Sequence, residues 1–343
     1  MTHATLRTPR RLLAAALLVA ASGVARGSGE CRPADNIAWV AGGGECLAIR
    51  TLAAADPAPQ PTLFVTVHGD TGPTTRAAER YHEALAVLHG GRIVTVALVR
   101  PGFSDDRGRY SSGHSDTSVR GSSYNERNTV AIAEAIDALR RHHHAARVVA
   151  LGVSGGAALL ANALALRPET APDVAILAAC PCDVPAWIRH RGGGAVTLSP
   201  HALVDKVPAG VTVIAATGTE DTNALPEFGR AYAERLRARG VRARFEAIAG
   251  ATHENLLSNS QFRHLVARAL TADGADVPGA RPRPDPRRML SAMDRDGDGR
   301  IGRSEWRGPP ARFQMLDADG DGFVTLEELG KARTWALKGD ATD

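Results

Sequence analysis

The sequence predicts an α/β fold, in which helices flank a mostly parallel β-sheet, followed by a small α-helical second domain. From residue 36 to 272, short apolar segments of strand length alternate with segments of helical periodicity, which is typical of a parallel sheet. Residues 273–288 are rich in proline, glycine and arginine, as in a linker, and residues 289–343 carry 11 acidic against 8 basic side chains. We therefore expect a large body at 36–272, a linker at 273–288 and a small domain at 289–343.

Strands and helices alternate through the body in a regular order. Strands are predicted at Asn36–Ala41, Cys46–Leu52, Thr62–Val67, Arg92–Leu98, Arg147–Leu151, Val174–Ala179, Val211–Ala216 and Arg244–Ala249. Helices are predicted at Thr74–Leu88, Glu126–His143, Gly155–Leu166, Pro226–Arg239 and Leu256–Leu270. Three glycines at 42–44 predict that the first two strands form a hairpin.

Residues 1–25 have the features of a secretory signal peptide. Three arginines, the last of them Arg11, precede an apolar run from Leu12 to Ala21, and small residues follow as far as Ala25. That run is too short to span a bilayer, and no other segment is long and apolar enough to do so. We expect a secreted or periplasmic protein with no membrane partner; the alternative is a disordered basic leader on a cytosolic protein.

The charge of the chain indicates no nucleic-acid partner. The formal net charge is +4, but the leader holds three arginines and no acid, so +1 remains without it. A nucleic-acid-binding domain normally carries its basic excess on the mature surface. The basic total is therefore an average over an export signal and an acidic C-terminal domain.

Four cysteines in an exported chain indicate disulfides. Cys31 with Cys46 closes a short local loop and is the first choice for a bridge. Cys180 and Cys182, separated by one residue, form either a small-ring disulfide or two free thiols. They lack the second pair that a zinc site needs.

A candidate nucleophile follows the predicted strand Arg147–Leu151. The segment Gly152–Gly156 has the form G-x-S-x-G around Ser154 and precedes a small, helix-prone run. Such a serine lies on a tight strand-to-helix turn, where side chains two residues away on either side would collide. The N-terminus of the following helix directs its dipole at the negative charge that forms on a substrate oxygen.

An acid and a histidine follow in the order that a Ser–acid–His triad of this type requires. Asp221 follows the seventh predicted strand and is our choice for the acid, and His253 follows the eighth. His253 would activate Ser154 as a general base, while the acid fixes the imidazole tautomer and stabilises its charged form. Glu220 and Asp183 remain alternatives for the acid.

Backbone amides for an oxyanion hole are predicted at two places. The strand Thr62–Val67 ends in His68-Gly69, so the N–H of Asp70 lies in a flexible turn after it. The N–H of Gly155, directly after the serine, is the second candidate. His68 itself is interpreted as a hydrogen-bonded core histidine.

With these motifs in place, residues 36–272 resemble the α/β-hydrolase family. The matching segments are His68-Gly69, Arg100-Pro101-Gly102, Gly152–Gly156, Gly218–Asp221 and Thr252-His253. The resemblance implies a Ser154–Asp221–His253 triad and an acyl-enzyme mechanism, in a serine hydrolase of carboxylesterase or peptidase type. Family members hydrolyse esters, peptides, amides and lactones, so the motifs do not fix the substrate.

The cover over the site is predicted to be small. About 30 residues lie between the strands that end near Ala179 and start near Val211, enough for one helix and a loop. This favours an open site for soluble esters or chain ends. The loop Phe103–Asn125 forms the other wall or is a disordered surface loop. Its polar contacts would be Ser111, Ser112, Ser115 and Tyr124.

Two Ca²⁺-binding loops are predicted in the C-terminal domain. Residues 294–305 and 317–328 each fit the twelve-residue EF-hand loop, in which carboxylates, one backbone carbonyl and a final glutamate surround a hard cation. The predicted ligands are Asp294, Asp296, Asp298, the carbonyl of Arg300, Glu305, Asp317, Asp319, Asp321, the carbonyl of Phe323 and Glu328. Ile301 and Val324 are expected to pair the loops through a short β-bridge. We interpret the pair as a structural or docking module with no particular protein partner indicated.

Two functions follow from these motifs. The first is a secreted serine hydrolase that cleaves an ester or amide bond of a small-molecule or peptide substrate and carries a calcium-binding EF-hand module. The second is a calcium-binding interaction protein whose α/β-hydrolase body is catalytically inactive. The serine, acid and histidine in the required order favour the first.

Overall fold

The structure is a computed structural model that describes residues 1, 34–54, 58–71, 92–271, 286–307, 313, 316, 317 and 319–331. Several predicted features lie outside the described residues and stay predictions. They are the signal peptide beyond Met1, most of the linker and the helix Thr74–Leu88. Cys31 also lies outside the described residues. No helix in the described part of the chain is both long enough and apolar enough to cross a bilayer.

The chain enters the sheet through a β-hairpin, as predicted. β1 (Trp39–Gly42) pairs antiparallel with β2 (Glu45–Leu52). The two residues of the turn, Gly43 and Gly44, have φ values of +58° and +76°. A two-residue hairpin turn with positive φ at both positions matches the twist of the strands, and glycine adopts it without strain.

Eight strands form one sheet in the order β1-β2-β4-β3-β5-β6-β7-β8. The pairs at the β1 and β2 edge are antiparallel, and every pair from β4 to β8 is parallel, which confirms the predicted mostly parallel sheet. The other strands are β3 (Thr62–Val67), β4 (Ile93–Leu98), β5 (Arg147–Val153), β6 (Val174–Ala178), β7 (Thr212–Gly218) and β8 (Arg242–Ile248). Because parallel strands end at one edge, the loops after β3, β5, β7 and β8 meet there.

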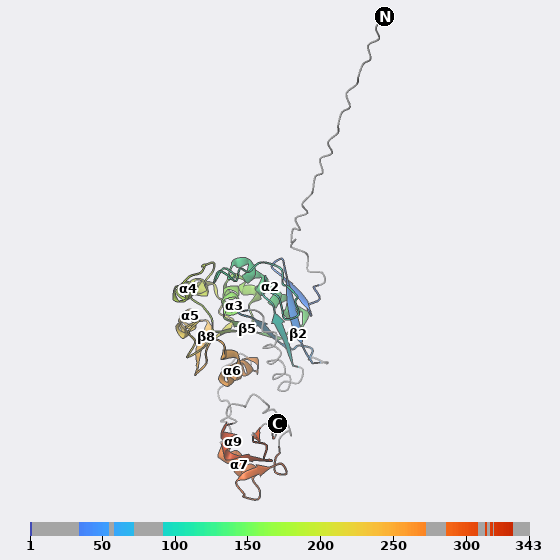
Figure 1. Cartoon of the computed structure of the whole chain (residues 1–343), viewed down its shortest axis with the longest axis vertical. Coiled ribbons are helices and arrows are strands. Elements are labelled where there is room, and N and C mark those ends of the chain that lie inside the picture. Colours follow the sequence, from blue (N-terminus) through green and yellow to red (C-terminus); the bar gives the residue numbers. More distant parts are fainter. Residues whose placement is uncertain are drawn as a thin grey trace.

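Helices flank the sheet (Figure 1). Helices α2 (Glu126–His142), α3 (Gly155–Leu166) and α5 (Pro226–Ala238) share one hydrophobic cluster with the strands, and α6 (Ser260–Thr271) contributes to a second cluster. Alternate residues of a strand point to opposite faces, so the two clusters lie on the two sides of the sheet. This is the layered arrangement expected for an α/β fold.

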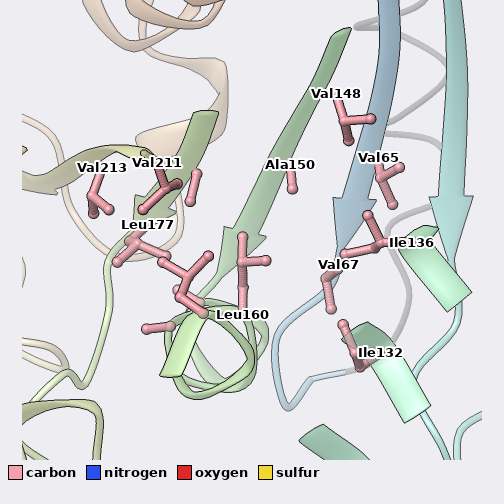
Figure 2. Close-up of a cluster of buried hydrophobic side chains, with 14 of the residues drawn as sticks. Val65, Val67, Ile132, Ile136, Val148, Ala150, Leu160, Leu177, Val211 and Val213 are labelled. Carbon is pink, nitrogen blue, oxygen red and sulfur yellow. The ribbon is translucent and has the colours of Figure 1, made fainter. Parts of the chain in front are cut away.

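Figure 2 shows part of the first cluster. Val65 and Val67 of β3 face Ile132 and Ile136 of α2, while Leu160 of α3 lies beneath β5. These five side chains are 0–1% exposed. Burial of apolar surface stabilises the fold by roughly 25 cal/mol per Å², so this packing holds in place β3 and β5, two of the four strands whose following loops form the candidate site.

The segment between β6 and β7 holds one α-helix, as predicted. The carboxylate of Asp183 accepts the N–H of Ala186 and so caps α4 (Val184–Arg191). A disulfide joins Cys180 and Cys182 directly before this helix, which decides between the two forms left open by the sequence. The predicted Cys31–Cys46 bridge stays a prediction. The short 3₁₀ helices of the body are η1 (Pro168–Thr170), η2 (Pro200–Lys206) and η3 (Leu256–Ser258).

Two elements start three or four residues later than predicted, because a side chain takes over backbone hydrogen bonds before each of them. Before β1, Oδ1 of Asp35 accepts the N–H groups of residues 37, 38 and 39, so the strand starts at Trp39 and not at Asn36. Before α6, Asn259 is extended and its Oδ1 accepts the N–H of Gln261. The predicted helix from Leu256 is therefore a 3₁₀ turn followed by a separate helix that starts at Ser260.

The C-terminal segment has a hydrophobic cluster of its own. Its elements are α7 (Pro286–Met293), β9 (Arg300–Gly302), β10 (Phe323–Thr325) and α9 (Leu326–Lys331). β9 and β10 pair antiparallel with Ile301 opposite Val324, and both side chains are buried with Phe313 and Leu316. The predicted β-bridge between the two loops is confirmed.

Candidate active site

Ser154 lies on the turn between β5 and α3 with φ of +50° and ψ of −119°. Its N–H donates to the carbonyl of Ala178 on β6 at 2.8 Å, which attaches the turn to the sheet. Positive φ is strained for a residue other than glycine, and such residues gather at functional sites. The structure therefore gives Ser154 the strand-to-helix geometry that the G-x-S-x-G pattern predicts.

The outer glycines of the pattern allow three backbone segments to approach one another. A Cβ on Gly152 would lie 2.6 Å from Cα of Ala157 in α3. A Cβ on Gly156 would lie 2.4 Å from the carbonyl oxygens of both Val67 and His68 at the end of β3. Backbone atoms at these distances cannot move aside without shifting a strand or a helix. Glycine at both positions is thus required for α3 to begin directly against β3 and β5.

His253 connects Ser154 with Asp221. In the loop after β8, its Nδ1 lies 2.8 Å from Oδ2 of Asp221 and its Nε2 lies 3.1 Å from Oγ of Ser154. A carboxylate only accepts hydrogen bonds, so Nδ1 carries the proton and Nε2 accepts the serine hydroxyl. The ring is 17% exposed, whereas the Asp221 carboxylate is fully buried. This tautomer leaves Nε2 ready to take the proton of Ser154.

Asp221 is the acid that reaches His253. Its other oxygen, Oδ1, accepts the N–H groups of Asn223 and Ala224, each at 2.9 Å, so the carboxylate is fixed in orientation. The two alternative acids lie elsewhere: Glu220 is exposed, and Asp183 caps α4 with its second oxygen 3.5 Å from His201. The geometry selects Asp221 from the three candidates, and its role in catalysis stays a prediction.

Both predicted oxyanion donors lie beside Ser154. Gly155 is the first residue of α3, and the first N–H groups of a helix have no partner within it. Asp70 follows β3 by two residues, and a Cβ on the intervening Gly69 would lie 3.2 Å from Cβ of Ser154. The loop after β3 therefore passes close to the nucleophile, and the oxyanion hole stays a prediction.

Sequence reasoning missed the environment of the Asp70 side chain. Its Oδ1 lies 2.7 Å from Nη1 of Arg100, and its Oδ2 accepts the hydroxyl of Tyr124 at 2.5 Å. Arg100 and Tyr124 are both 0% exposed. The Arg100-Pro101-Gly102 turn was noted in the sequence only as a family feature, and no local pattern indicates that its arginine pairs with an acid 30 residues away.

His68 is a buried neutral histidine, as interpreted from the sequence. Its Nδ1 donates to the carbonyl of Gly69 at 2.7 Å, and its Nε2 accepts the backbone N–H of Arg100 at 3.0 Å. Burial, followed by the positive charge of Arg100, lowers the pKa of His68 to about 3. Both ring nitrogens are occupied, so His68 fixes the end of β3 against the end of β4.

A cavity of about 530 Å³ opens over the nucleophile. Ser154, His253 and Asp70 line it, with Val153, Trp187 and Leu257 as apolar walls. Two exposed arginines, Arg120 and Arg191, and two exposed acids, Asp116 and Glu254, stand around it. A cavity of this size suits a small-molecule substrate.

The loop Phe103–Asn125 forms one wall of this cavity, but through other residues than predicted. Its contributions are Asp116, Thr117, Val119, Arg120, Gly121 and Ser123. The predicted contacts Ser111, Ser112 and Ser115 instead bond to nearby protein groups: Ser111 donates to the carbonyl of Val99, Ser112 to Glu45 and Ser115 to the carbonyl of Pro101. In the sequence, a serine that stabilises its own loop looks the same as a serine that contacts a ligand.

The first predicted Ca²⁺ loop folds around its own carboxylates. Oδ2 of Asp294 accepts the N–H of Gly299 at 2.9 Å, and Oε2 of Glu305 accepts the N–H of Gly302 at 2.7 Å. Backbone N–H groups, that of Gly302 foremost, lower the pKa of Glu305. Oxygens of Asp294, Asp296 and Glu305 lie within 4.8 Å of one another. The first loop therefore places three of its predicted carboxylate ligands close together.

The second loop gathers Asp317, Asp319 and Asp321 in the same way, with oxygens within 4.8 Å of one another. Asp317 is 7% exposed, and its Oδ1 has no hydrogen-bond partner within the described residues. A buried carboxylate oxygen without a partner fits a ligand of a hard cation. Asp298 and Glu328 belong to the two loops but not to these two groups. The carbonyl-bearing residues Arg300 and Phe323 lie at the start of β9 and β10.

One family model matches part of the chain. The EF-hand family model matches residues 287–308 and 311–331. No curated protein sequence matches the chain.

Solved structures resemble about two thirds of the chain. A hyperthermophilic esterase from Pyrobaculum calidifontis is 14% identical with a TM-score of 0.52, covering 69% of this chain and 83% of that one. An esterase from Pyrococcus furiosus is 13% identical with a TM-score of 0.51, covering 68% and 90%. An esterase from Exiguobacterium antarcticum is 13% identical with a TM-score of 0.50, covering 69% and 100%. These likenesses confirm the α/β-hydrolase fold.

Proposed function

We propose that this chain, in which an α/β-hydrolase fold precedes an EF-hand pair, is a serine hydrolase that cleaves esters or amides through an acyl-enzyme. The observation that carries the proposal is the position of the His253 ring, within hydrogen-bond distance of both Ser154 and Asp221. The three residues come from loops after three different strands and are 32 and 99 positions apart. A triad is recognised by this geometry and not by sequence position.

In the first half of the reaction, Nε2 of His253 takes the hydroxyl proton of Ser154 while Oγ attacks the substrate carbonyl carbon. The carbonyl electron pair moves onto oxygen, and the N–H groups of Asp70 and Gly155 bind this oxyanion. The intermediate then collapses, the bond to the alcohol or amine breaks, and the leaving group takes the proton from His253. Asp221 stabilises the imidazolium between these two transfers.

In the second half, a water molecule gives its proton to His253 and attacks the acyl carbon. The resulting tetrahedral intermediate expels Oγ of Ser154, which regains the proton from His253. The acid product leaves and the resting hydrogen bonds of the triad are restored.

The cavity supports a soluble, moderate-sized substrate. Trp187 and Leu257 give it apolar walls, while the exposed charged groups around it favour a substrate with a polar end. The only α-helix between β6 and β7 is the two-turn α4, so the site has little cover. The three solved structures described above are esterases. Together these features make carboxylic esters the first substrate class to test, with aminoacyl or peptide amides second.

The EF-hand pair is proposed to bind two Ca²⁺ ions. The converging carboxylates of both loops and the unpartnered, buried Oδ1 of Asp317 fit this cation. Asp294, Asp296, Asp298, the carbonyl of Arg300 and Glu305 would hold one ion, and Asp317, Asp319, Asp321, the carbonyl of Phe323 and Glu328 the other. Each bound ion would neutralise a cluster of carboxylates and so stabilise this small domain.

We further propose that the protein is secreted or periplasmic. The basic and apolar features of residues 1–25 support export. The Cys180–Cys182 disulfide supports an oxidising compartment, and calcium is abundant outside the cell, where weak EF-hand sites are occupied.

Labelling with a fluorophosphonate tests the proposed nucleophile. The wild type should form a covalent adduct at Ser154 and hydrolyse a chromogenic ester, and the Ser154→Ala variant should do neither. Ser258→Ala is the matched control, because Ser258 is exposed and does not line the cavity. Labelling of the Ser154→Ala variant at the wild-type rate would contradict the proposal.

A further inference from the structure

Arg100 is the largest fully buried side chain of the described structure, at 0% exposure. Its Nη1 lies 2.7 Å from Oδ1 of Asp70, and the same nitrogen lies 3.4 Å from the carbonyl of His68. The guanidinium carbon lies 4.8 Å from the centre of the Phe103 ring. A fixed positive charge is therefore held directly behind the loop that passes over Ser154.

The partner of this charge lies in the cavity itself. The Asp70 side chain is 35% exposed and lines the cavity beside Ser154 and His253. A Cβ on Gly155 would lie 2.2 Å from Oδ1 of Asp70, so the carboxylate rests against the residue that supplies the other oxyanion donor. A free carboxylate at this position would repel the negative charge that forms on the substrate oxygen, because like charges close together disfavour one another.

The stability of the fold does not by itself explain why a buried arginine occupies position 100. Its Nε and Nη2 are buried and have no hydrogen-bond partner within the described residues. Buried donors without a partner cost free energy, and an apolar side chain of similar volume is often as stable as a buried ion pair. The feature that an apolar side chain lacks is the positive charge next to Asp70.

Tyr124 holds the second oxygen of the same carboxylate. Its hydroxyl donates to Oδ2 of Asp70 at 2.5 Å. Burial, followed by the negative charge of Asp70, raises the pKa of Tyr124 well above its ordinary value, so the hydroxyl keeps its proton. The ring packs in the hydrophobic cluster with Leu159 and Trp187, which anchors the hydroxyl. Arg100 and Tyr124 thus fix the Asp70 side chain from two sides.

We propose that Arg100 is a positioning residue of the oxyanion hole: it neutralises Asp70 and, with Tyr124, holds the loop after β3 so that the N–H of Asp70 faces the substrate oxygen. The inference rests on the proposed serine hydrolase function and adds to it a group that never touches the substrate. Arg100 therefore lowers the free energy of the transition state, in which the oxyanion exists, and leaves substrate binding unchanged.

The test compares kcat and KM of the full-length, calcium-loaded protein with p-nitrophenyl butyrate. In Arg100→Met the apolar side chain leaves the Asp70 carboxylate beside the oxyanion without its positive partner, while the Tyr124 hydroxyl still donates to Oδ2. We expect kcat to fall by about 100-fold, the typical effect of losing one oxyanion donor, with KM nearly unchanged. The double variant Asp70→Asn/Arg100→Met keeps the backbone N–H and removes both charges. We expect it to recover at least about tenfold of the loss in kcat.

Arg109→Met is the matched control. Arg109 pairs with the buried carboxylate of Asp105 at 2.7 Å on the same loop, but neither residue lines the cavity. This variant should keep the wild-type kcat. Melting temperatures of all variants show which of them fold. If Arg100→Met does not fold, Arg100→Lys and Tyr124→Phe take its place, each with an expected loss of about tenfold in kcat at constant KM.

Several results would overturn the inference. A kcat for Arg100→Met that equals the wild-type value would do so, and so would a double variant as slow as the single one, since both point to a purely structural arginine. Unchanged kcat in Arg100→Lys and Tyr124→Phe would have the same meaning. If the wild type neither hydrolyses esters nor reacts with a fluorophosphonate, the proposed function fails and this inference with it; an active wild type confines the failure to Arg100.

Discussion

The two oxygens of the Asp221 carboxylate have separate partners: Oδ2 faces Nδ1 of His253 at 2.8 Å, and Oδ1 accepts two backbone N–H groups at 2.9 Å. The carboxylate is therefore unable to rotate, and the histidine ring is held in one tautomer. The hydrogen bonds of Asp221 therefore connect the conformation of the loop after β7 to the tautomer of His253, the candidate base.

Asp221→Asn tests that link. The amide keeps the size and the backbone contacts but is able to donate to Nδ1, which places the histidine proton on Nε2, the wrong nitrogen. In a triad such a change lowers kcat by about 10⁴-fold. The measurement is ester hydrolysis under saturating substrate, with Asp183→Asn as the control because Asp183 caps the N-terminus of α4 and its carboxylate lies beside His201. Equal activity of Asp221→Asn and wild type would remove Asp221 from the mechanism.

The close approach of β3 and α3 gives a second prediction. In Gly156→Ala the new methyl would lie 2.4 Å from two backbone oxygens at the end of β3, so a strand or helix must shift. Overpacking of this kind costs about 1–3 kcal/mol of folding free energy, and the shift also displaces Ser154.

Gly210→Ala is the matched comparison, since nothing lies within 4 Å of a Cβ at that position. Urea unfolding should show a loss for Gly156→Ala and almost none for Gly210→Ala, and ester hydrolysis should fall only in the former. If both variants unfold at the same urea concentration, the steric account of the elbow is wrong.

Local rules predicted much of the fold and of the site. β3 (Thr62–Val67) and α3 (Gly155–Leu166) have the predicted bounds, because an apolar run between turn residues and a run of alanine and leucine are complete local signals. Ser154 was found through the steric need for glycine around it. His253 and Asp221 were found through their places after consecutive strands, which the topology of the sheet brings to one edge.

The features that the sequence did not predict depend on contacts of individual side chains, either between distant loops or within one short segment. Arg100 and Tyr124 lie 30 and 54 positions from Asp70, and the sequence around neither residue contains a pattern that predicts its contact with Asp70. The shift at β1 depends on one side chain, Asp35, that competes with the strand for three N–H groups. Residue propensities and hydrophobic periodicity do not predict which backbone groups an individual side chain will bond.

The EF-hand pair provides a third prediction, in which calcium stabilises its own domain and not the body with the α/β-hydrolase fold. With dissociation constants of about 0.1–1 mM, 10 mM Ca²⁺ adds about 1.4–2.7 kcal/mol to the stability of the domain for each of the two bound ions. Calorimetry of the full chain should show one transition that moves down when a chelator is added, while most of the ester hydrolysis remains.

Glu328→Gln, which alters one of the two proposed sites, should abolish about half of that calcium-dependent shift, whereas Glu327→Gln should keep it. The two glutamates are neighbours on α9, but Glu328 is buried at 8% exposure at loop position 12 and Glu327 is exposed. Loss of hydrolysis in parallel with the calorimetric shift would mean that the body and the EF-hand pair are energetically coupled.

The buried His68 predicts how stability depends on acid. Its pKa is about 3 in the folded chain, against about 6.5 for an ordinary histidine, mainly because of burial. Between these values the unfolded chain binds a proton that the folded chain excludes, so the contribution is complete above pH 6.5 and is lost as the pH falls toward 3. The slope from this residue is at most about 1.4 kcal/mol per pH unit.

Urea unfolding at pH 7.0, 5.5 and 4.5 measures this slope in the wild type and in His68→Gln, which does not titrate. We expect the wild type to lose about 2–3 kcal/mol more than the variant between pH 7.0 and 4.5. His114→Gln replaces an exposed histidine and should keep the wild-type slope. Parallel curves for wild type and His68→Gln would show that His68 accepts a proton in the folded chain, and the neutral tautomer that fixes the end of β3 against β4 would then be wrong.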